Sequence, residues 1–291
     1  MERPSGFFSV GAFSLTFSGI LLIMKVSLVE GGMTMASPRN TLNTLIHEKK
    51  SKIGGGFYSR FQVDFAYHSN RIEGSRLTHD QTRYIFETHT VDGTAYVEDI
   101  IEAANHFKCF DFILDTVQEP ITEEYIKKLH LLLKKGLEDD EHDDVVIGDY
   151  KKYPNVVGEI ETLHPKDVHA HMAALIDDFS KKETIDLYDV ADFHARFEKI
   201  HPFYDGNGRV GRLLALKMCL AADIVPFFIN DNEKMFYYMG LREWQNEGKK
   251  QRLLDVFLTM QDDMKRILDY FMIEYDPADV MARDLMKKHQ D

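Results

Sequence analysis

Cysteine is scarce in this chain, which has two cysteines among 291 residues. Cys109 and Cys219 lie far apart in the sequence and fit no spacing typical of a metal site. We therefore expect two reduced, buried thiols of the kind found in cytosolic proteins, and a cytoplasmic location.

Positive charge is also in short supply. Lysine and arginine together number 35 against 48 aspartates and glutamates, which gives a formal net charge of −13. Without a dense Lys/Arg stripe we expect no nucleic acid partner, and the acidic surplus disfavours anionic membranes. Apolar residues make up 44% and charged residues 29% of the chain, which is typical of a soluble globular protein with a sizeable core.

A long uncharged run lies near the start, at residues 6–24. It is long enough to span a bilayer, but it lacks the clear small-x-small cleavage site of a signal peptide. Two interpretations of a leader at residues 1–34 stay open. It is translated from a wrongly assigned start, since Met24, Met33 and Met35 could each be the initiator, or it is a membrane anchor through residues 6–24.

Beyond this leader the apolar spacing is helical almost throughout, without internal repeats. We expect helices at residues 42–52, 57–72, 78–88, 94–114, 122–135, from 165, 186–200, from the glycine-rich loop to about 222, and again towards the C-terminus. Val145–Leu163 alone combines β-forming residues with turn signals, which predicts a small hairpin. The expected fold class is all-α, a helical bundle with one small β-hairpin.

The most informative segment runs from His201 to Arg212 and reads HPFYDGNGRVGR. Gly206 and Gly208 let the backbone approach a ligand just before a helix whose first N–H groups favour an anion. Arg209 and Arg212 are three residues apart, so both can lie on one face of that helix. Their planar forks suit phosphate oxygens.

The same segment supplies a metal ligand and a base. Asp205 is a hard oxygen ligand of the kind that Mg²⁺ prefers. His201 has an unperturbed pKa of about 6.5, which suits a base at neutral pH. Base, metal ligand, anion nest and paired arginines therefore fall within 12 residues, and phosphoryl or nucleotidyl transfer needs this combination.

Two other phosphate-binding motifs are excluded. Gly206, Gly208 and Gly211 match the dinucleotide-binding pattern G-x-G-x-x-G, but that pattern must follow a β-strand. Here the preceding run, Asp192–Ile200, is charged and helical in its pattern. The sequence also has no G-x-x-x-x-G-K-[ST] of a P-loop.

His201–Arg212 resembles, without a departure, the Fic-family motif H-P-F-x-[DE]-G-N-G-R-x-x-R. The resemblance implies an all-α Fic fold that uses ATP with Mg²⁺ and transfers AMP to a Ser, Thr or Tyr hydroxyl of a target protein, including its own. It makes His201 the general base and Asp205 the metal ligand, with Phe203 anchoring the loop and the arginines on the β/γ-phosphates. The ATP-binding residues that it implies in this segment are Phe203, Gly206, Asn207, Gly208, Arg209, Val210, Gly211 and Arg212.

Residues 148–168 resemble the Fic flap and the helix that follows it. By that resemblance Val156, Val157 and Gly158 would pair with an extended segment of the target protein, as an added β-strand does. One departure is Lys151, which occupies a place where the family usually has Arg and receives no role here.

The family's adenine pocket has a weaker counterpart. Tyr237 and Tyr238 resemble it, with Gln245 or Asn246 as a polar contact. Plain helix packing of the two tyrosines is the alternative interpretation.

Residues 69–74, SNRIEG, resemble the family's inhibitory signature [ST]-x-x-x-E-[GN]. Ser69, Glu73 and Gly74 carry the match. A Glu73 carboxylate delivered to Arg212 would form a charge-assisted fork and deny that arginine to the γ-phosphate. The inhibition would act within the chain or between the subunits of a homodimer. An exposed glutamate at a helix end is the alternative.

The resemblance divides the chain after its leader into an N-terminal helical region with the inhibitory helix at 35–115, a Fic core at 116–262 and a C-terminal helical extension at 263–291. Other functions stay open: a Fic-fold transferase with another nucleotide donor, removal of AMP, or an ATP-binding regulatory module with little turnover. His164, His169 and His171 do not suggest a metal site, because residues two apart on a helix diverge.

Overall fold

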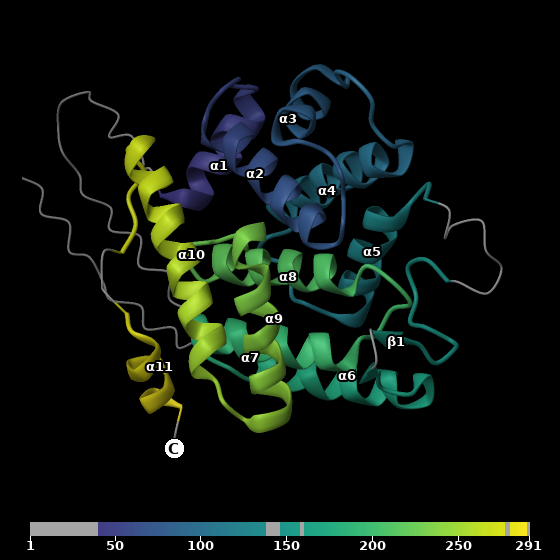
Figure 1. Cartoon of the computed structure of the whole chain (residues 1–291). Coiled ribbons are helices and arrows are strands. Elements are labelled where there is room, and N and C mark those ends of the chain that lie inside the picture. Colours follow the sequence, from purple (N-terminus) through teal and green to yellow (C-terminus); the bar gives the residue numbers. More distant parts are fainter. Residues whose placement is uncertain (1–39, 138–145, 158–159, 277–279, 290–291) are drawn as a thin grey trace, which may run out of the picture. The chain divides into compact units, whose positions relative to one another are not determined.

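The computed structural model describes residues 40–137, 146–157, 160–276 and 280–289 (Figure 1). The expected leader at 1–34 and Gly158 of the expected flap lie outside these residues. Within the described part of the chain, no helix is both long and apolar enough to cross a membrane.

Helices dominate the described residues, and the all-α fold class is confirmed. They are α1 (Thr41–Ser51), α2 (Phe57–Ile72), α3 (His79–Thr88), α4 (Val97–Asp115), α5 (Glu123–Lys134), α6 (Pro165–Ser180), α7 (Leu187–Ile200), α8 (Asn207–Ala221), α9 (Lys234–Arg242), α10 (Gln251–Tyr270) and α11 (Ala282–Lys288). A 3₁₀ turn, η2 (Asp231–Glu233), precedes α9, and a π-helical turn, η3 (Glu243–Glu247), follows it.

Several helices begin where a short polar side chain caps them. Thr78 accepts a hydrogen bond from the backbone N–H of Gln81, whose side chain accepts one from Thr78 in return, and this capping box starts α3. Thr122 caps α5 and Asp186 caps α7 in similar ways. The residues expected to open these three helices are therefore their N-caps.

The strand-like prediction for Val145–Leu163 was too long. The described strands in this region are β1 (Val156–Val157) and β2 (Ile160–Glu161), which pair antiparallel. The backbone N–H of Lys151 donates to the carbonyl of Pro202 (2.9 Å), and not to a neighbouring strand. The segment is thus fastened to the glycine-rich loop, and its expected use as a flap stays a prediction.

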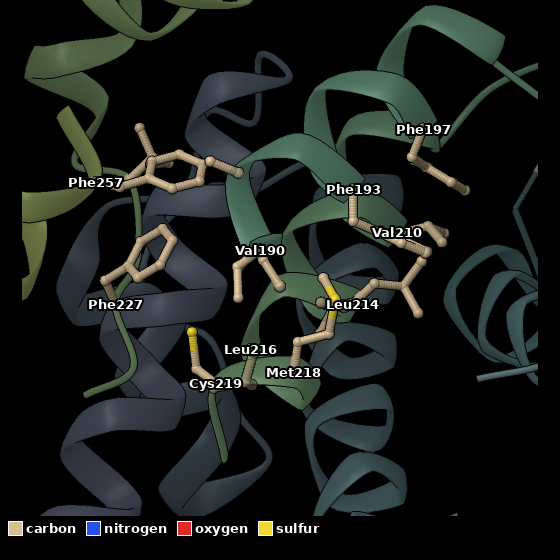
Figure 2. Packing of buried hydrophobic residues seen from close by; sticks show 14 of the residues in the cluster. Val190, Phe193, Phe197, Val210, Leu214, Leu216, Met218, Cys219, Phe227 and Phe257 are labelled. Atoms are coloured by element: carbon tan, nitrogen blue, oxygen red, sulfur yellow. The ribbon is translucent and has the colours of Figure 1, made fainter. Parts of the chain in front are cut away.

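The main core lies around α7 and α8. Apolar side chains from these two helices face one another, and Phe227 packs against Phe257 of α10 with ring centroids 4.5 Å apart and the ring planes tilted (Figure 2). The buried residues labelled on α7 and α8 are Val190, Phe193, Phe197, Val210, Leu214, Leu216, Met218 and Cys219. Burying a large apolar side chain contributes about 1.5–3 kcal/mol, so this contact holds the α7–α8 loop between two rigid elements.

Both cysteines are buried and free, as expected. Burial raises the pKa of both thiols well above its usual range, so neither is a reactive thiolate.

A second, smaller cluster fastens α2, α3 and α4 to one another. It consists of Ala66, Leu77, Ile85, Ala103 and Phe107. The C-terminal end of α2 and the middle of α4 therefore belong to one frame, and both contribute a carboxylate to the site described next.

Candidate active site

The chain turns sharply between α7 and α8, and two residues in left-handed backbone conformation make the turn. His201 is the C-cap of α7 with φ 51°, and Gly206 is the N-cap of α8 with φ 80°. Glycine adopts this conformation freely, whereas for other residues it costs about 1–3 kcal/mol. Because a helix and not a strand precedes the loop, the exclusion of a dinucleotide-binding motif is confirmed.

Two side chains hold the loop from within. Asn207 is buried, and its side-chain amide bonds both ways to the backbone of Phe203, accepting from the N–H (2.8 Å) and donating to the carbonyl (2.9 Å). Phe203 is fully buried and stacks on His130 of α5 at 3.9 Å between ring centroids. His130 in turn lies 3.1 Å from the carbonyl of Asp205 through Nε2. Contacts within the protein therefore hold the loop in place without a ligand.

His201 is half-buried and carries a neutral imidazole at neutral pH. Burial lowers its pKa to about 4, and the positive charge of Lys151 acts in the same direction. Burial likewise lowers the pKa of Lys151 to about 8, and its Nζ donates to Asn155 Oδ1 (2.9 Å) and Thr162 Oγ1 (2.6 Å). A neutral imidazole beside a cation can accept a proton but does not hold one in the resting state.

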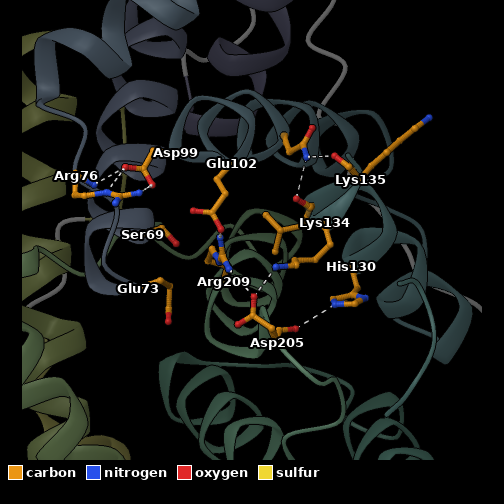
Figure 3. Close-up of polar contacts among 12 residues, drawn as sticks. Ser69, Glu73, Arg76, Asp99, Glu102, His130, Lys134, Lys135, Asp205 and Arg209 are labelled. Carbon is orange, nitrogen blue, oxygen red and sulfur yellow. Dashed lines mark hydrogen bonds and ion pairs between the residues drawn. The ribbon is translucent and has the colours of Figure 1, made fainter. Parts of the chain in front are cut away.

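Asp205 presents an ionised carboxylate. Lys134 of α5 contacts its Oδ2 at 2.5 Å, and Arg209 donates to the same oxygen at 3.2 Å (Figure 3). Burial alone would raise the pKa of Asp205, but the charges of Arg209 and Lys134 outweigh it and lower the pKa to about 2. The side chain is 50% exposed. An ionised, accessible carboxylate fits Mg²⁺, which takes one or two carboxylates and completes its shell with water and phosphate oxygens.

The two arginines of the motif are buried, and each contacts a carboxylate from the N-terminal helices. Arg212 donates through Nη2 to Glu73 Oε1 (2.6 Å) and to the carbonyl of Ser69 (3.0 Å), and through Nε to Ser69 Oγ (3.0 Å). Arg209 donates through Nη1 to Glu102 of α4. The expected contact between Glu73 and Arg212 is therefore present in the structure.

Glu73 lies against the first turn of α8. A Cβ atom at Gly208 would come within 2.5 Å of Glu73 Oε1, so the absence of a side chain at Gly208 makes room for this carboxylate. The Glu73 side chain is 29% exposed, and its partial desolvation would raise its pKa, but the charges of Arg212 and Arg209 outweigh this and lower the pKa. Gly74 follows with φ 106°, a conformation that suits glycine, and lets the chain leave α2 directly after the glutamate.

Val210 and Gly211 face the core side of α8. Val210 is fully buried, and a Cβ atom at Gly211 would overlap Glu198 Oε1 of α7. These two residues therefore determine how closely α8 approaches α7.

Of the residues expected at the adenine pocket, the structure buries or packs two and leaves two accessible. Tyr237 is buried, with its hydroxyl 2.7 Å from His194 Nε2, and Gln245 Nε2 donates to the carbonyl of Ala195 (2.9 Å). Helix packing accounts for both contacts without a ligand. Tyr238 is 41% exposed and Asn246 is exposed, so these two are accessible to a ligand.

At the expected flap, Val156 is exposed. His169 and His171 point to separate partners: His169 Nδ1 lies 2.8 Å from Glu123 Oε2, and His171 Nδ1 lies 2.9 Å from the carbonyl of Asp167. His164 caps α6. The three histidines thus make no common site.

The sequence did not point to His130, Lys134 or Glu102. Glu102 lies 107 residues before Arg209, and Lys134 lies 71 residues before Asp205. The fold alone brings them to the loop.

Known proteins resemble both the sequence and the fold of this chain. A sequence profile of the Fic/DOC family matches residues 120–219. The protein adenylyltransferase Fic of Drosophila willistoni is 28% identical over 218 residues, which cover 68% of this chain and 42% of that protein. The protein adenylyltransferase Fic of Nematostella vectensis is 30% identical over 183 residues, covering 61% and 42% respectively. The chain thus spans less than half the length of these relatives.

Solved structures agree on the fold. A Fic domain containing signaling protein from Bacteroides thetaiotaomicron superposes with a TM-score of 0.60 at 24% identity, over 79% of this chain and 90% of that one. Fic-1 from C. elegans superposes with a TM-score of 0.62 at 19% identity, over 79% and 72%. The motif at His201–Arg212, the helices that carry it and these matches lead to one assignment: the chain carries a domain of the Fic/DOC family.

Proposed function

We propose that this chain transfers AMP from ATP to a Ser, Thr or Tyr hydroxyl of a target protein, including its own, and that Glu73 restrains this activity. One observation carries the proposal. A neutral imidazole, an ionised carboxylate and two buried guanidinium groups meet at the N-terminus of α8. The names of the relatives, protein adenylyltransferase Fic, support the choice of AMP transfer.

In this reaction His201 takes the proton of the target hydroxyl. The hydroxyl oxygen then forms a bond to the α-phosphorus of ATP, the bond from that phosphorus to the β-bridging oxygen breaks, and pyrophosphate leaves with the electron pair. A histidine whose pKa is lowered to about 4 is unprotonated at pH 7 and is ready to act as this base.

The phosphates would lie at the start of α8. Its first N–H groups, at Asn207 and Gly208, favour an anion, and Arg209 and Arg212 would neutralise the charge that develops on the leaving pyrophosphate. Asp205 would hold Mg²⁺, which supplies further charge neutralisation when bound. Tyr238 would contact the adenine, with Tyr237 and Gln245 behind it as packing residues.

The restraint follows from competition for one arginine. Glu73 Oε1 and a γ-phosphate oxygen cannot both occupy the Nη2 side of Arg212. With Glu73 in place, ATP would lose the alignment of its α-phosphorus on which transfer depends.

Removing the Glu73 carboxylate is the direct test. We expect Glu73→Gly to incorporate more AMP than the wild-type chain from ATP labelled at the α-phosphate, both into itself and into proteins of a cell lysate. Glu98→Gly, at an exposed position on α4, is the matched control and should behave as wild type. Mass spectrometry should find the adduct on Ser, Thr or Tyr. A Glu73→Gly protein that incorporates no AMP would contradict the proposal, and parallel assays with UTP and GTP would reveal another donor.

A further inference from the structure

A row of alternating charges passes through the candidate site. Glu102 of α4 accepts from Arg209, Arg209 donates to Asp205, and Asp205 also contacts Lys134 of α5 (Figure 3). The side chains of Arg209, Lys134 and Glu102 are 3%, 5% and 18% exposed, whereas that of Asp205 is 50% exposed. The row is thus buried except at the residue proposed to bind the metal.

The guanidinium group of Arg209 contacts two carboxylates. Its Nη1 faces Glu102 and its Nη2 faces Asp205 at 3.2 Å. If Glu102 were uncharged, Asp205 would be the nearer of the remaining carboxylates to face this buried guanidinium, and the pair would tighten. Buried charges are held strongly to the partners that remain, because water does not replace a lost one.

The two cations contact the same oxygen of Asp205. Both Lys134 Nζ and Arg209 Nη2 contact Oδ2. Two cations therefore orient the carboxylate through Oδ2 while its side chain stays 50% exposed, and neighbouring residues hold metal ligands in place in this way.

We propose that Glu102 is a positioning residue for the divalent metal that accompanies ATP: by neutralising Arg209 from the far side, it keeps Asp205 available to the metal. The inference rests on the proposed function. It predicts that Glu102 contributes to nucleotide binding only when the metal is present.

The test separates metal-dependent from metal-free nucleotide binding. In a Glu73→Gly background, calorimetry measures the Kd of a non-hydrolysable ATP analogue in EDTA and again in saturating Mg²⁺. For Glu102→Gln, which keeps the size of the side chain and removes its charge, we expect the gain in affinity from Mg²⁺ to fall about 10-fold or more. The affinity in EDTA should stay unchanged or improve, because the site has become more positive.

Two further variants make the result specific. Glu98→Gln removes the same charge from an exposed position one turn away on α4, and it should keep the full Mg²⁺ gain. Glu102→Asp keeps the charge, and it should retain most of the gain even if the shorter side chain lowers thermal stability.

The outcomes are distinct. An undiminished Mg²⁺ gain in Glu102→Gln overturns the inference. Equal losses with and without Mg²⁺ overturn it too, because Glu102 would then only support the fold. If the Glu73→Gly parent binds no ATP analogue, the proposed function fails, and the inference falls with it; if the parent binds with a clear Mg²⁺ gain that Glu102→Gln shares, the inference alone fails.

Discussion

The surroundings of His201 determine both its protonation state and its position. A free histidine would be partly protonated near neutral pH, whereas burial and Lys151 keep this imidazole neutral. The backbone at His201 is held in the left-handed region, with its N–H bonded to the carbonyl of Phe197 (3.0 Å). The C-terminal end of α7 therefore fixes the position of His201.

Replacing this side chain should remove transfer but not binding. In the Glu73→Gly background, we expect His201→Ala to lower the rate of AMP transfer by about 10²–10⁴-fold, while the Kd for ATP changes little. The measurement is incorporation of labelled AMP beside calorimetry of ATP binding. His171→Ala, at an exposed histidine of α6, is the control. Transfer that survives in His201→Ala would exclude this residue as the base.

Some residues of the candidate site could be predicted from the sequence and others could not. His201, Asp205 and the two arginines could be identified because they fall within one continuous motif. Glu102 and Lys134 could not, because nothing local distinguishes a glutamate on α4 or a lysine at the end of α5 from a solvated charge. Only the packing of α4 and α5 against α8 assigns them to the site.

At the scale of elements, helix starts were predictable because their causes are local. Thr78, Thr122 and Asp186 cap helices within three residues of themselves. The region around Lys151 was not, because its backbone partner is Pro202, far along the chain. The residues around Lys151 favour a strand locally, but their backbone is held by the loop at Pro202.

The contact of α8 with α7 should depend on the lack of a side chain at Gly211. A Cβ atom there would overlap Glu198 Oε1 and come within 3.0 Å of His194 Cε1, so we expect Gly211→Ala to lower the free energy of unfolding by about 1–3 kcal/mol. Urea unfolding followed by circular dichroism measures this change.

Gly54→Ala is the matched control. Nothing lies within 4 Å of a Cβ atom at Gly54, and its φ is not in the left-handed region, so alanine there should be neutral or add about 0.4–1 kcal/mol. If Gly211→Ala and Gly54→Ala had the same free energy of unfolding, the α7–α8 contact would tolerate a side chain at Gly211 and the prediction would be wrong.

At the scale of the whole molecule, buried histidines make stability depend on pH. His106 is fully buried, and neither ring nitrogen has a hydrogen-bond partner among the residues that the structure describes. Burial, together with the charges of Arg212 and Arg209, lowers its pKa to about 3. The unfolded chain takes up this proton below about pH 6.5 and the folded chain does not, so stability is lost as the pH falls from about 6.5 towards 3.

Replacing His106 should remove its share of that loss. Between pH 6.5 and 5 we expect the wild-type free energy of unfolding to fall by about 2 kcal/mol more than that of His106→Phe, which keeps an aromatic ring beside Phe65. Urea unfolding at both pH values measures the difference. His47→Phe, at an exposed position, should follow the wild type. Parallel pH profiles of wild type and His106→Phe would refute the assignment.

The frame of α2, α3 and α4 has a consequence for how this protein can be divided. The family match covers residues 120–219, which include Arg209 and Arg212 but neither Glu73 nor Glu102. A fragment cut at those limits would keep both buried arginines and Asp205, but it would lose Glu73, the carboxylate on Arg212, and Glu102, one of the two carboxylates on Arg209. The stretch that the family profile matches is therefore shorter than the stretch that pairs both arginines with their carboxylates, and the longer one is the unit to express.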